Sequence, residues 1–179
     1  MRVISFAKNR VTDSTYVSKM EALEAVCAAH GVTTNFEVLP KGGNYRDICR
    51  TKPTYIYNRL IKLEEDLLWI DADTRVTYID PDLTSLTPIA GRCKQSDIFM
   101  VASVVLYRFL PETLTVLQDA ARFVKEQPDI MDHFALLLAL KDHRDWITPL
   151  TDAQIRFTDG SSRKAYGVKK ALKDGTRRR

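Results

Sequence analysis

The sequence predicts an α/β protein in which a mostly parallel central sheet is flanked by helices. Two short apolar runs, Arg2–Ala7 and Leu67–Ile70, are typical of buried strands, and the second is apolar at every position, as in strands covered on both faces. Segments with helical periodicity lie between the predicted strands. A chain of 179 residues has the length of one domain with a substantial core.

The first half of the chain alternates between strand and helix patterns. After the first strand, apolar side chains recur every three or four residues, and Gly31 then provides a helix stop. These positions are Tyr16, Met20, Leu23 and Cys27, which we interpret as core. Residues 33–39 alternate as a second strand, with Phe36 and Val38 predicted to point inward.

The next helix and strand lead to a pair of acids. Thr51 is a candidate N-cap of a helix that opens with Lys52 and Pro53, and a buried stripe follows at Ile56, Leu60 and Leu63. Asp71 and Asp73 come directly after the apolar strand, at the sheet edge where open α/β sheets bind ligands. Two carboxylates so close can both reach Mg²⁺ or Mn²⁺, which often share oxygen ligands with substrate phosphates. The alternative is that both acids cap a turn.

The second half of the chain has weaker patterns. Residues 75–79 are predicted to form an edge strand, 80–86 a turn and short helix, 87–95 a loop, and 97–109 strand material. Helices are expected to begin at Pro111 and at Pro128, with Asp132 and His133 in the first turn of the second. Two short extended pieces follow, at 146–150 and 154–158.

Composition excludes several classes of protein. The hydrophobic fraction of 45% and the charged fraction of 28% are ordinary for a globular domain. No apolar run approaches the roughly 20 residues of a membrane span, and the N-terminus lacks the apolar length of a signal peptide. Cys27, Cys49 and Cys93 are widely spaced, which favours reduced thiols over a disulfide framework or zinc site. We therefore expect a cytoplasmic setting.

Positive charge is concentrated at the C-terminus. Residues 163–179 hold eight of the 27 Lys and Arg residues but only one of the 23 acids, so this segment carries +7 and the rest of the chain −3. A basic tail can attract phosphates, nucleic acid or an anionic surface, or it can be a solvated terminus.

The block from Lys52-Pro53 to Asp71-Ala72-Asp73 resembles the nucleotide-diphospho-sugar glycosyltransferases of the GT-A fold, in particular small bacterial and phage members. The resemblance implies a single GT-A-like, Rossmann-like domain over residues 1–164 and a separate basic tail over 165–179. It also implies an enzyme that moves a sugar from a nucleotide-diphosphate donor, most often a UDP-sugar, to a hydroxyl acceptor. The Asp-x-Asp motif of these enzymes holds Mn²⁺ or Mg²⁺, here through Asp71 and Asp73.

The resemblance also suggests residues that bind the donor. Positions near the base, ribose, sugar and diphosphate would be Phe6, Ala7, Lys8, Lys52, Ala72, Ser103, His133 and Arg163. Ser103 matches weakly, because relatives carry Ser-Gly-Thr there. Relatives also place a metal-binding His before the C-terminal Ser-Arg element, and here Asp159 is the candidate substitute.

Asp132 is the candidate catalytic residue, because relatives open the corresponding helix with an acid that points into the active site. In an inverting enzyme it would act as the base that deprotonates the acceptor, and in a retaining enzyme it would orient the sugar. A favourable interaction with the helix dipole is the alternative explanation for this acid.

Two other functions remain open from the sequence. A nucleotidyltransferase would also use paired acids and a divalent ion, but the usual Gly-rich phosphate loop is missing. A non-catalytic nucleic-acid-binding protein would explain the basic tail and leave the acid pair without a role. The chain is short for a glycosyltransferase, which suits an acceptor with bulk of its own, such as DNA with hydroxylated bases or a protein surface.

Overall fold

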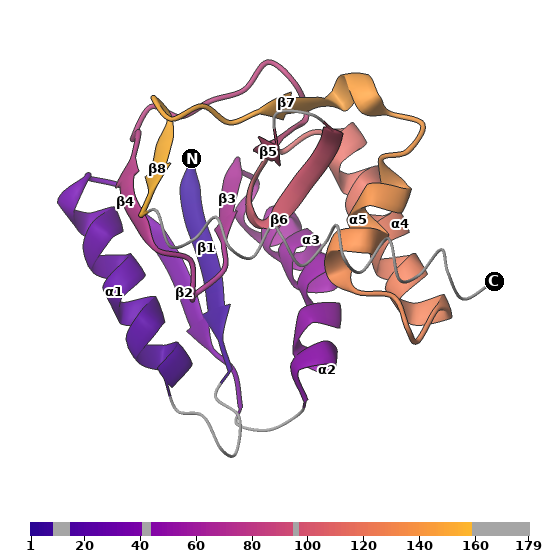
Figure 1. The fold of residues 1–179 in the computed structure, drawn as a ribbon, viewed down its shortest axis with the longest axis horizontal. Coiled ribbons are helices and arrows are strands. Elements are labelled where there is room, and N and C mark those ends of the chain that lie inside the picture. Colours follow the sequence, from indigo (N-terminus) through magenta and orange to yellow (C-terminus); the bar gives the residue numbers. More distant parts are fainter. Residues whose placement is uncertain (9–14, 41–43, 95–96, 159–179) are drawn as a thin grey trace.

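A six-stranded sheet forms the centre of the computed structural model, which describes residues 1–8, 15–40, 44–94 and 97–158 (Figure 1). The strand order is β2 (Thr34–Val38), β1 (Arg2–Ala7), β3 (Leu67–Ile70), β6 (Asp97–Tyr107), β5 (Ile89–Lys94) and β7 (Ile147–Pro149). Only β6 opposes its neighbours, since β1 is parallel to β2 and β3, and β5 is parallel to β7. The predicted mostly parallel α/β sheet is therefore confirmed.

Helices cover both faces of the sheet (Figure 1). Helix α1 (Thr15–Ala29) lies on one face, and α3 (Lys52–Leu63), α4 (Pro111–Glu126) and α5 (Asp132–Ala139) lie on the other. The two short helices are α2 (Tyr45–Arg50), which precedes α3, and the 3-10 turn η1 (Arg144–Trp146). The positive φ of 68° at Gly31 ends the α1 region, as the sequence predicts.

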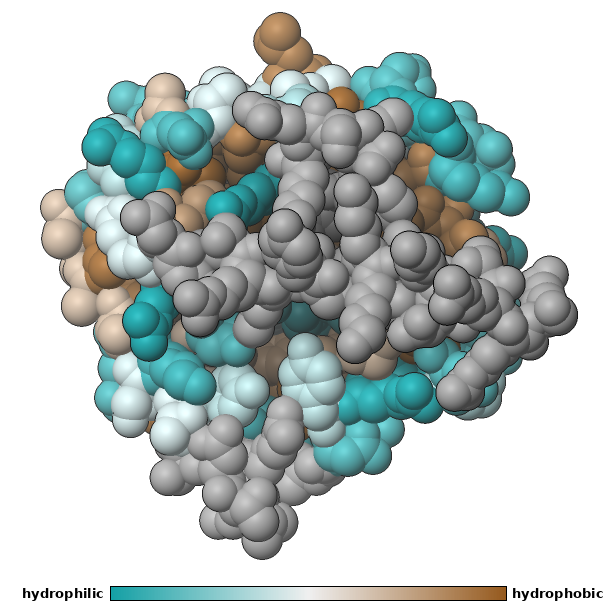
Figure 2. All heavy atoms as spheres, in the orientation of Figure 1, coloured by the Kyte–Doolittle hydropathy of each residue, from teal (hydrophilic) through white to brown (hydrophobic). Residues whose placement is uncertain are grey.

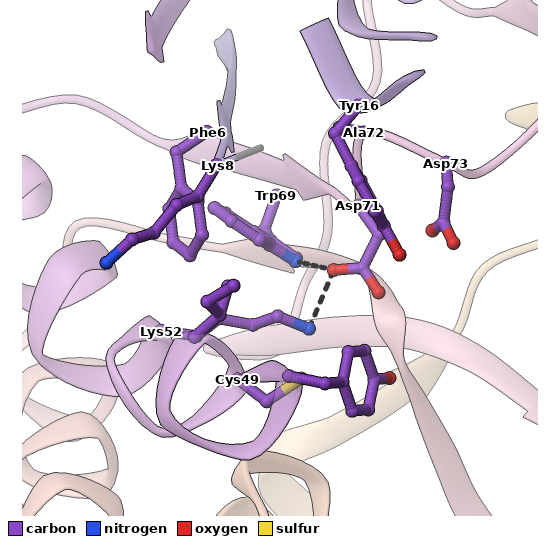
Figure 3. Close-up of a pocket in the computed structure, with 11 residues that line it drawn as sticks. Phe6, Lys8, Tyr16, Cys49, Lys52, Trp69, Asp71, Ala72 and Asp73 are labelled. Atoms are coloured by element: carbon purple, nitrogen blue, oxygen red, sulfur yellow. Dashed lines mark hydrogen bonds and ion pairs between the residues drawn. The ribbon is translucent and has the colours of Figure 1, made fainter. Parts of the chain in front are cut away.

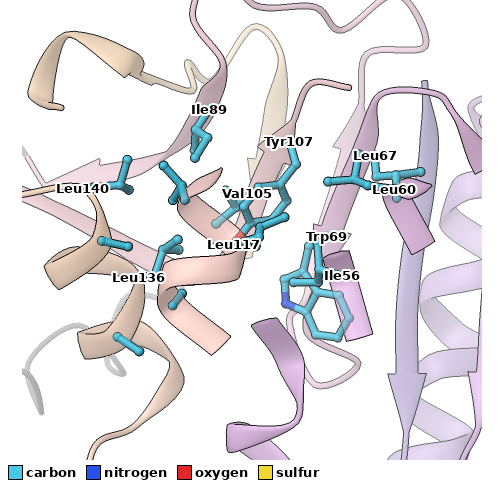
Figure 4. Packing of buried hydrophobic residues seen from close by; sticks show 14 of the residues in the cluster. Ile56, Leu60, Leu67, Trp69, Ile89, Val105, Tyr107, Leu117, Leu136 and Leu140 are labelled. Carbon is cyan, nitrogen blue, oxygen red and sulfur yellow. The ribbon is translucent and has the colours of Figure 1, made fainter. Parts of the chain in front are cut away.

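Alternation along β3 explains why this strand is apolar throughout. Leu67 and Trp69 pack in the cluster under α3, α4 and α5 (Figure 4), whereas Leu68 and Ile70 pack in the cluster under α1. All four side chains are at most 1% exposed. Each face of the strand therefore contributes to a different half of the core.

A second, two-stranded sheet lies beside the main one. Strands β4 (Val76–Ile79) and β8 (Ile155–Phe157) pair antiparallel, and α1 packs against β4. The edge strand predicted at residues 75–79 is thus present. Residues 80–86 form turns and bends without the predicted short helix.

Other boundaries also differ from prediction. The loop predicted at residues 87–95 contains β5, which joins β6 to β7 and buries Ile89 and Ala90. Helix α5 begins at Asp132, several residues after Pro128, and α2 was not predicted. Val38, predicted to point inward, is 57% exposed because it lies at the open end of the edge strand β2.

The described surface visible in Figure 2 is mostly hydrophilic, with hydrophobic side chains in smaller patches between. Within the described residues, no helix is long and apolar enough to cross a membrane.

Helix α2 is fastened to the end of α4 by an arginine. The Arg50 guanidinium donates hydrogen bonds to the backbone carbonyls of Val124 and Pro128, and more weakly to that of Gln127 at 3.4 Å. These carbonyls belong to the last turn of α4 and the segment after it, where carbonyls have no partner within the helix. The contact holds α2 against the connection that leads to α5.

We expect Arg50→Gln to lower the free energy of unfolding by about 2 kcal/mol, because charged hydrogen bonds to carbonyls that end a helix would be lost. Urea denaturation followed by circular dichroism measures this change. The matched control is Arg122→Gln, which removes an exposed pair with Asp119 within α4 and should cost less than about 0.5 kcal/mol. Equal effects of the two substitutions would contradict the structural role of Arg50.

Candidate functional site

A cleft opens at the carboxyl ends of β1 and β3, bordered by α1, α2 and α3 (Figure 3). It contains about 500 Å³ of space not filled by atoms, open solvent included. Its charged lining consists of Lys8, Lys52, Asp71 and Asp73, and its aromatic lining of Phe6, Tyr16, Tyr45 and Trp69. This is the edge of the sheet at which the sequence predicts a ligand.

Lys52 lies between two carboxylates. Its Nζ is 2.8 Å from Asp71 Oδ1 and 2.8 Å from Asp132 Oδ2. The side chains of Lys52 and Asp132 are only 12% and 6% exposed. The Trp69 indole N–H also donates to Asp71 Oδ1, at 2.9 Å, and the Lys52 ammonium lies 5.6 Å from the centre of a Trp69 ring (Figure 3). A buried cation and an indole therefore fix the orientation of Asp71.

The charges of this group are mutually dependent. Burial alone would lower the pKa of Lys52, but Asp71 and then Asp132 reverse the effect and raise it well above its ordinary value. Burial alone would raise the pKa of Asp132, but Lys52 outweighs it and the result is a pKa of about 2. Lys52 and Asp132 thus remain a charged pair at neutral pH, whereas either group alone in this position would tend towards neutrality.

Three elements bring these groups together. Lys52 is the first residue of α3, Asp132 the first of α5, and Asp71 the first residue after β3. The Asp71 backbone N–H donates to the Ser103 carbonyl of β6 at 2.8 Å, which anchors the turn after β3. Thr51 does not cap α3 with its side chain as predicted. Its hydroxyl donates instead to the Ile48 carbonyl at 2.7 Å and closes α2.

Most of the predicted site residues gather at this sheet edge. The cleft is lined by Phe6, Lys8, Lys52, Asp71, Ala72 and Asp73, and Asp132 joins it through Lys52. Ala7 is fully buried and packs with Ala72 on the α1 side.

The remaining predicted residues are more distant from the cleft or cannot be placed. Ser103 is half-buried and contributes its backbone carbonyl. His133 has its Nδ1 3.6 Å from Asp132 Oδ1 and its ring against Phe134. Asp159 and Arg163 lie outside the described residues, as does the basic tail.

Five lining residues were not predicted as part of the site: Tyr16, Tyr45, Ile48, Cys49 and Trp69. Tyr16 fits the helical spacing of core residues and was interpreted as core, although it is half-buried. Tyr45 is 51% exposed at the start of a helix that the sequence did not reveal. Trp69 gave a usable signal, because an indole N–H in an aliphatic strand needs a polar partner.

The acid pair suits a divalent cation that is completed by a substrate. Among the described residues, both polar contacts to the Asp71 carboxylate go to Oδ1, which leaves Oδ2 for a ligand. Asp73 lines the same cleft (Figure 3). No group of three or more His, Cys, Asp or Glu side chains within the described part of the chain could hold a metal ion. Two carboxylates fit Mg²⁺ or Mn²⁺ if phosphate oxygens and water supply the remaining ligands.

The comparisons with known proteins add one finding at the level of fold. A solved structure described as a glycosyltransferase involved in the glycosylation of the major capsid of PBCV-1 matches with a TM-score of 0.59 at 13% identity. The match covers 84% of this chain and 81% of that one. The chain shares its fold with a glycosyltransferase. No family model and no curated protein matches the sequence.

The buried pair predicts a specific acid sensitivity. The pKa of Asp132 is about 2 in the folded protein against 3.8 ordinarily, so its contribution is complete above about pH 4 and is lost as the pH falls towards 2. The loss amounts to about 2 kcal/mol of unfolding free energy. We expect Asp132→Asn to remove this component, so that the unfolding free energy of the variant falls less between pH 4 and pH 2.

Urea denaturation at a series of pH values measures the difference between the two proteins. Asp129→Asn is the control, because Asp129 pairs with Arg46 at 3.0 Å but its side chain is 97% exposed. This control should keep the acid sensitivity of the unmodified protein. Parallel pH curves for the unmodified protein and Asp132→Asn would contradict the assignment.

Proposed function

We propose that the protein is a metal-dependent glycosyltransferase that uses a nucleotide-diphosphate sugar, with a UDP-sugar as the favoured donor. The observation that carries the proposal is the Lys52 ammonium held between Asp71 and Asp132 at the carboxyl end of β3, inside a cleft. The shared fold with a glycosyltransferase supports it. The fold alone would be compatible with other chemistry, so the proposal depends on the charged groups in the cleft.

Asp71 and Asp73 would hold Mn²⁺ or Mg²⁺ together with the diphosphate. The bound cation would supply Lewis-acid stabilisation of the departing nucleoside diphosphate. Lys52 keeps Asp71 in a fixed position, and Lys8 adds a positive charge to the cleft for phosphate oxygens. Asp159 and Arg163 remain proposals as a further metal ligand and a diphosphate contact.

The aromatic side of the cleft suits the nucleoside. Tyr16 and Tyr45 come from different helices and both line the cleft, and Tyr45 is half exposed. Flat aromatic faces beside a lysine are suited to a stacked base next to phosphate. These residues, with Phe6, would form the wall against which the base and ribose lie.

Asp132 is better suited to orienting than to deprotonating. A general base works best when its pKa lies near the working pH, and a pKa of about 2 makes Asp132 a weak base. Its carboxylate is also committed to Lys52. This supports the role in which Asp132 positions Lys52 and the transferred sugar, with His133 as a polar neighbour.

The acceptor would be a hydroxyl group on a large molecule, and a polyanion such as DNA with hydroxylated bases is our proposal. Support comes from the basic segment 163–179, which holds more cations than one diphosphate requires.

We expect Asp71→Asn and Asp73→Asn each to abolish Mn²⁺-dependent hydrolysis of UDP-sugars and to weaken donor binding at least tenfold, because each removes one charged metal ligand. Turnover assays with a panel of nucleotide sugars, with and without Mn²⁺, and calorimetry measure the two effects. Asp152→Asn, at an exposed position, is the control and should behave as the unmodified protein.

Unchanged metal and donor affinity in both variants would refute the metal site. Release of pyrophosphate from a nucleoside triphosphate by the unmodified protein, without sugar transfer, would identify a nucleotidyltransferase instead.

The basic tail should contribute to binding of the acceptor and not to hydrolysis of the donor. Replacing Lys169, Lys170 and Lys173 with Gln should leave UDP-sugar hydrolysis within twofold and weaken binding to duplex or single-stranded DNA. Fewer counterions would be released, so the slope of affinity against salt should also become shallower. Fluorescence anisotropy across a salt series measures both quantities. If the triple variant binds DNA as well as the unmodified protein at every salt concentration, the nucleic-acid acceptor loses its support.

A further inference from the structure

A second, smaller cavity also borders Lys52. Its polar lining consists of Lys52, Asp132 and Tyr107. Its other walls are apolar residues of α3, α4, α5 and β6, including Ile56, Leu117 and Leu136. Tyr107 comes from the end of β6 and is 2% exposed (Figure 4). The free space accommodates about one water-sized group.

One buried oxygen at this cavity, Asp132 Oδ2, has unused hydrogen-bonding capacity among the described residues. Asp132 Oδ2 is buried and pairs with Lys52 Nζ at 2.8 Å, and it has no other polar partner among the described residues. The neighbouring Tyr107 brings a hydroxyl to the same cavity. A buried carboxylate oxygen with a single partner has lone pairs left to satisfy, which favours a small polar ligand between it and the Tyr107 hydroxyl.

The available donors and acceptors match a hydroxyl oxygen. An ammonium has three N–H donors, and two of those of Lys52 are directed to Asp71 and Asp132. The phenol can donate and accept, while a carboxylate oxygen can only accept. Burial, followed by the charge of Asp132, raises the pKa of Tyr107, so its proton is retained. A small group with one donor and two acceptor sites would satisfy all three side chains.

We propose that the cavity is a binding site for a single hydroxyl group, formed by Tyr107, Asp132 and Lys52. Water occupies it in the free protein, or a hydroxyl of the transferred sugar occupies it in the donor complex. The second case rests on the proposed glycosyltransferase function, and the first does not. With water bound, Tyr107 positions Asp132 through that oxygen, and with the donor bound it contacts the sugar hydroxyl directly.

Tyr107→Phe tests the site because it removes one oxygen and keeps the ring that packs in the core. Tyr57→Phe is the matched control, since its hydroxyl accepts from Gln118 at 2.7 Å, away from both cavities. High-resolution crystal structures of the unmodified protein and both variants form the first arm. We expect an ordered water within hydrogen-bonding distance of Tyr107 and Asp132 in the unmodified protein and the control, and its loss from Tyr107→Phe.

The second arm compares kcat/KM for UDP-glucose, UDP-galactose and their singly deoxygenated analogues. If the sugar hydroxyl enters the cavity, Tyr107→Phe lowers kcat/KM roughly tenfold for the hydroxylated donor and leaves the matching deoxy donor unchanged. If water stays in the cavity, Tyr107→Phe affects all donors equally. A dry cavity in the unmodified protein, with unchanged discrimination between donors, overturns the proposal. Should no nucleotide sugar react, the proposed function fails, and the crystal structures alone decide whether the hydroxyl site exists.

Discussion

The interaction on which the site depends is the burial of one ammonium between two carboxylates. Lys52 is nearly inaccessible to water, and burial of an unpaired lysine would drive it towards neutrality. Asp71 and Asp132 prevent this, so the starts of α3 and α5 and the end of β3 must meet at one point. The surrounding fold can be understood as the framework that holds these three chain segments together.

Core packing and a contact between helices both support this meeting point. Trp69 belongs to the apolar cluster under α3 to α5, yet its indole N–H reaches Asp71, so the same side chain fills the core and orients the carboxylate. On the outer side, Arg50 fixes α2 to the end of α4, and this connection leads directly to Asp132. Trp69 and Arg50 therefore connect the packing of the core and helices to the charged groups of the site.

The sequence was informative wherever local pattern and burial agreed. The fully apolar β3 and the acids after it were predicted because a strand covered on both faces has a distinctive composition. Strand β5 was missed because its Gly91 and Arg92 have little strand preference, and because its pairing with β7 joins residues far apart in the chain. The contact of Lys52 with Asp132 spans 80 positions and leaves no local pattern. Tyr107 could not be predicted as a site residue either, because the pattern of β6 indicates only a buried tyrosine and not its distant neighbours.

Charge balance gives the proposed function a further consequence. Asp71, Asp73 and Asp132 outnumber Lys8 and Lys52, so these five side chains together carry −1. A diphosphate entering this environment alone would meet net repulsion, and a divalent cation entering alone would have only two protein carboxylates as ligands. Under the proposed function, each would therefore improve the site for the other, and this mutual dependence would be a reciprocal coupling free energy. Lys52 would affect the size of this coupling, because without that ammonium the same three acids would attract the cation more strongly and repel the donor more strongly.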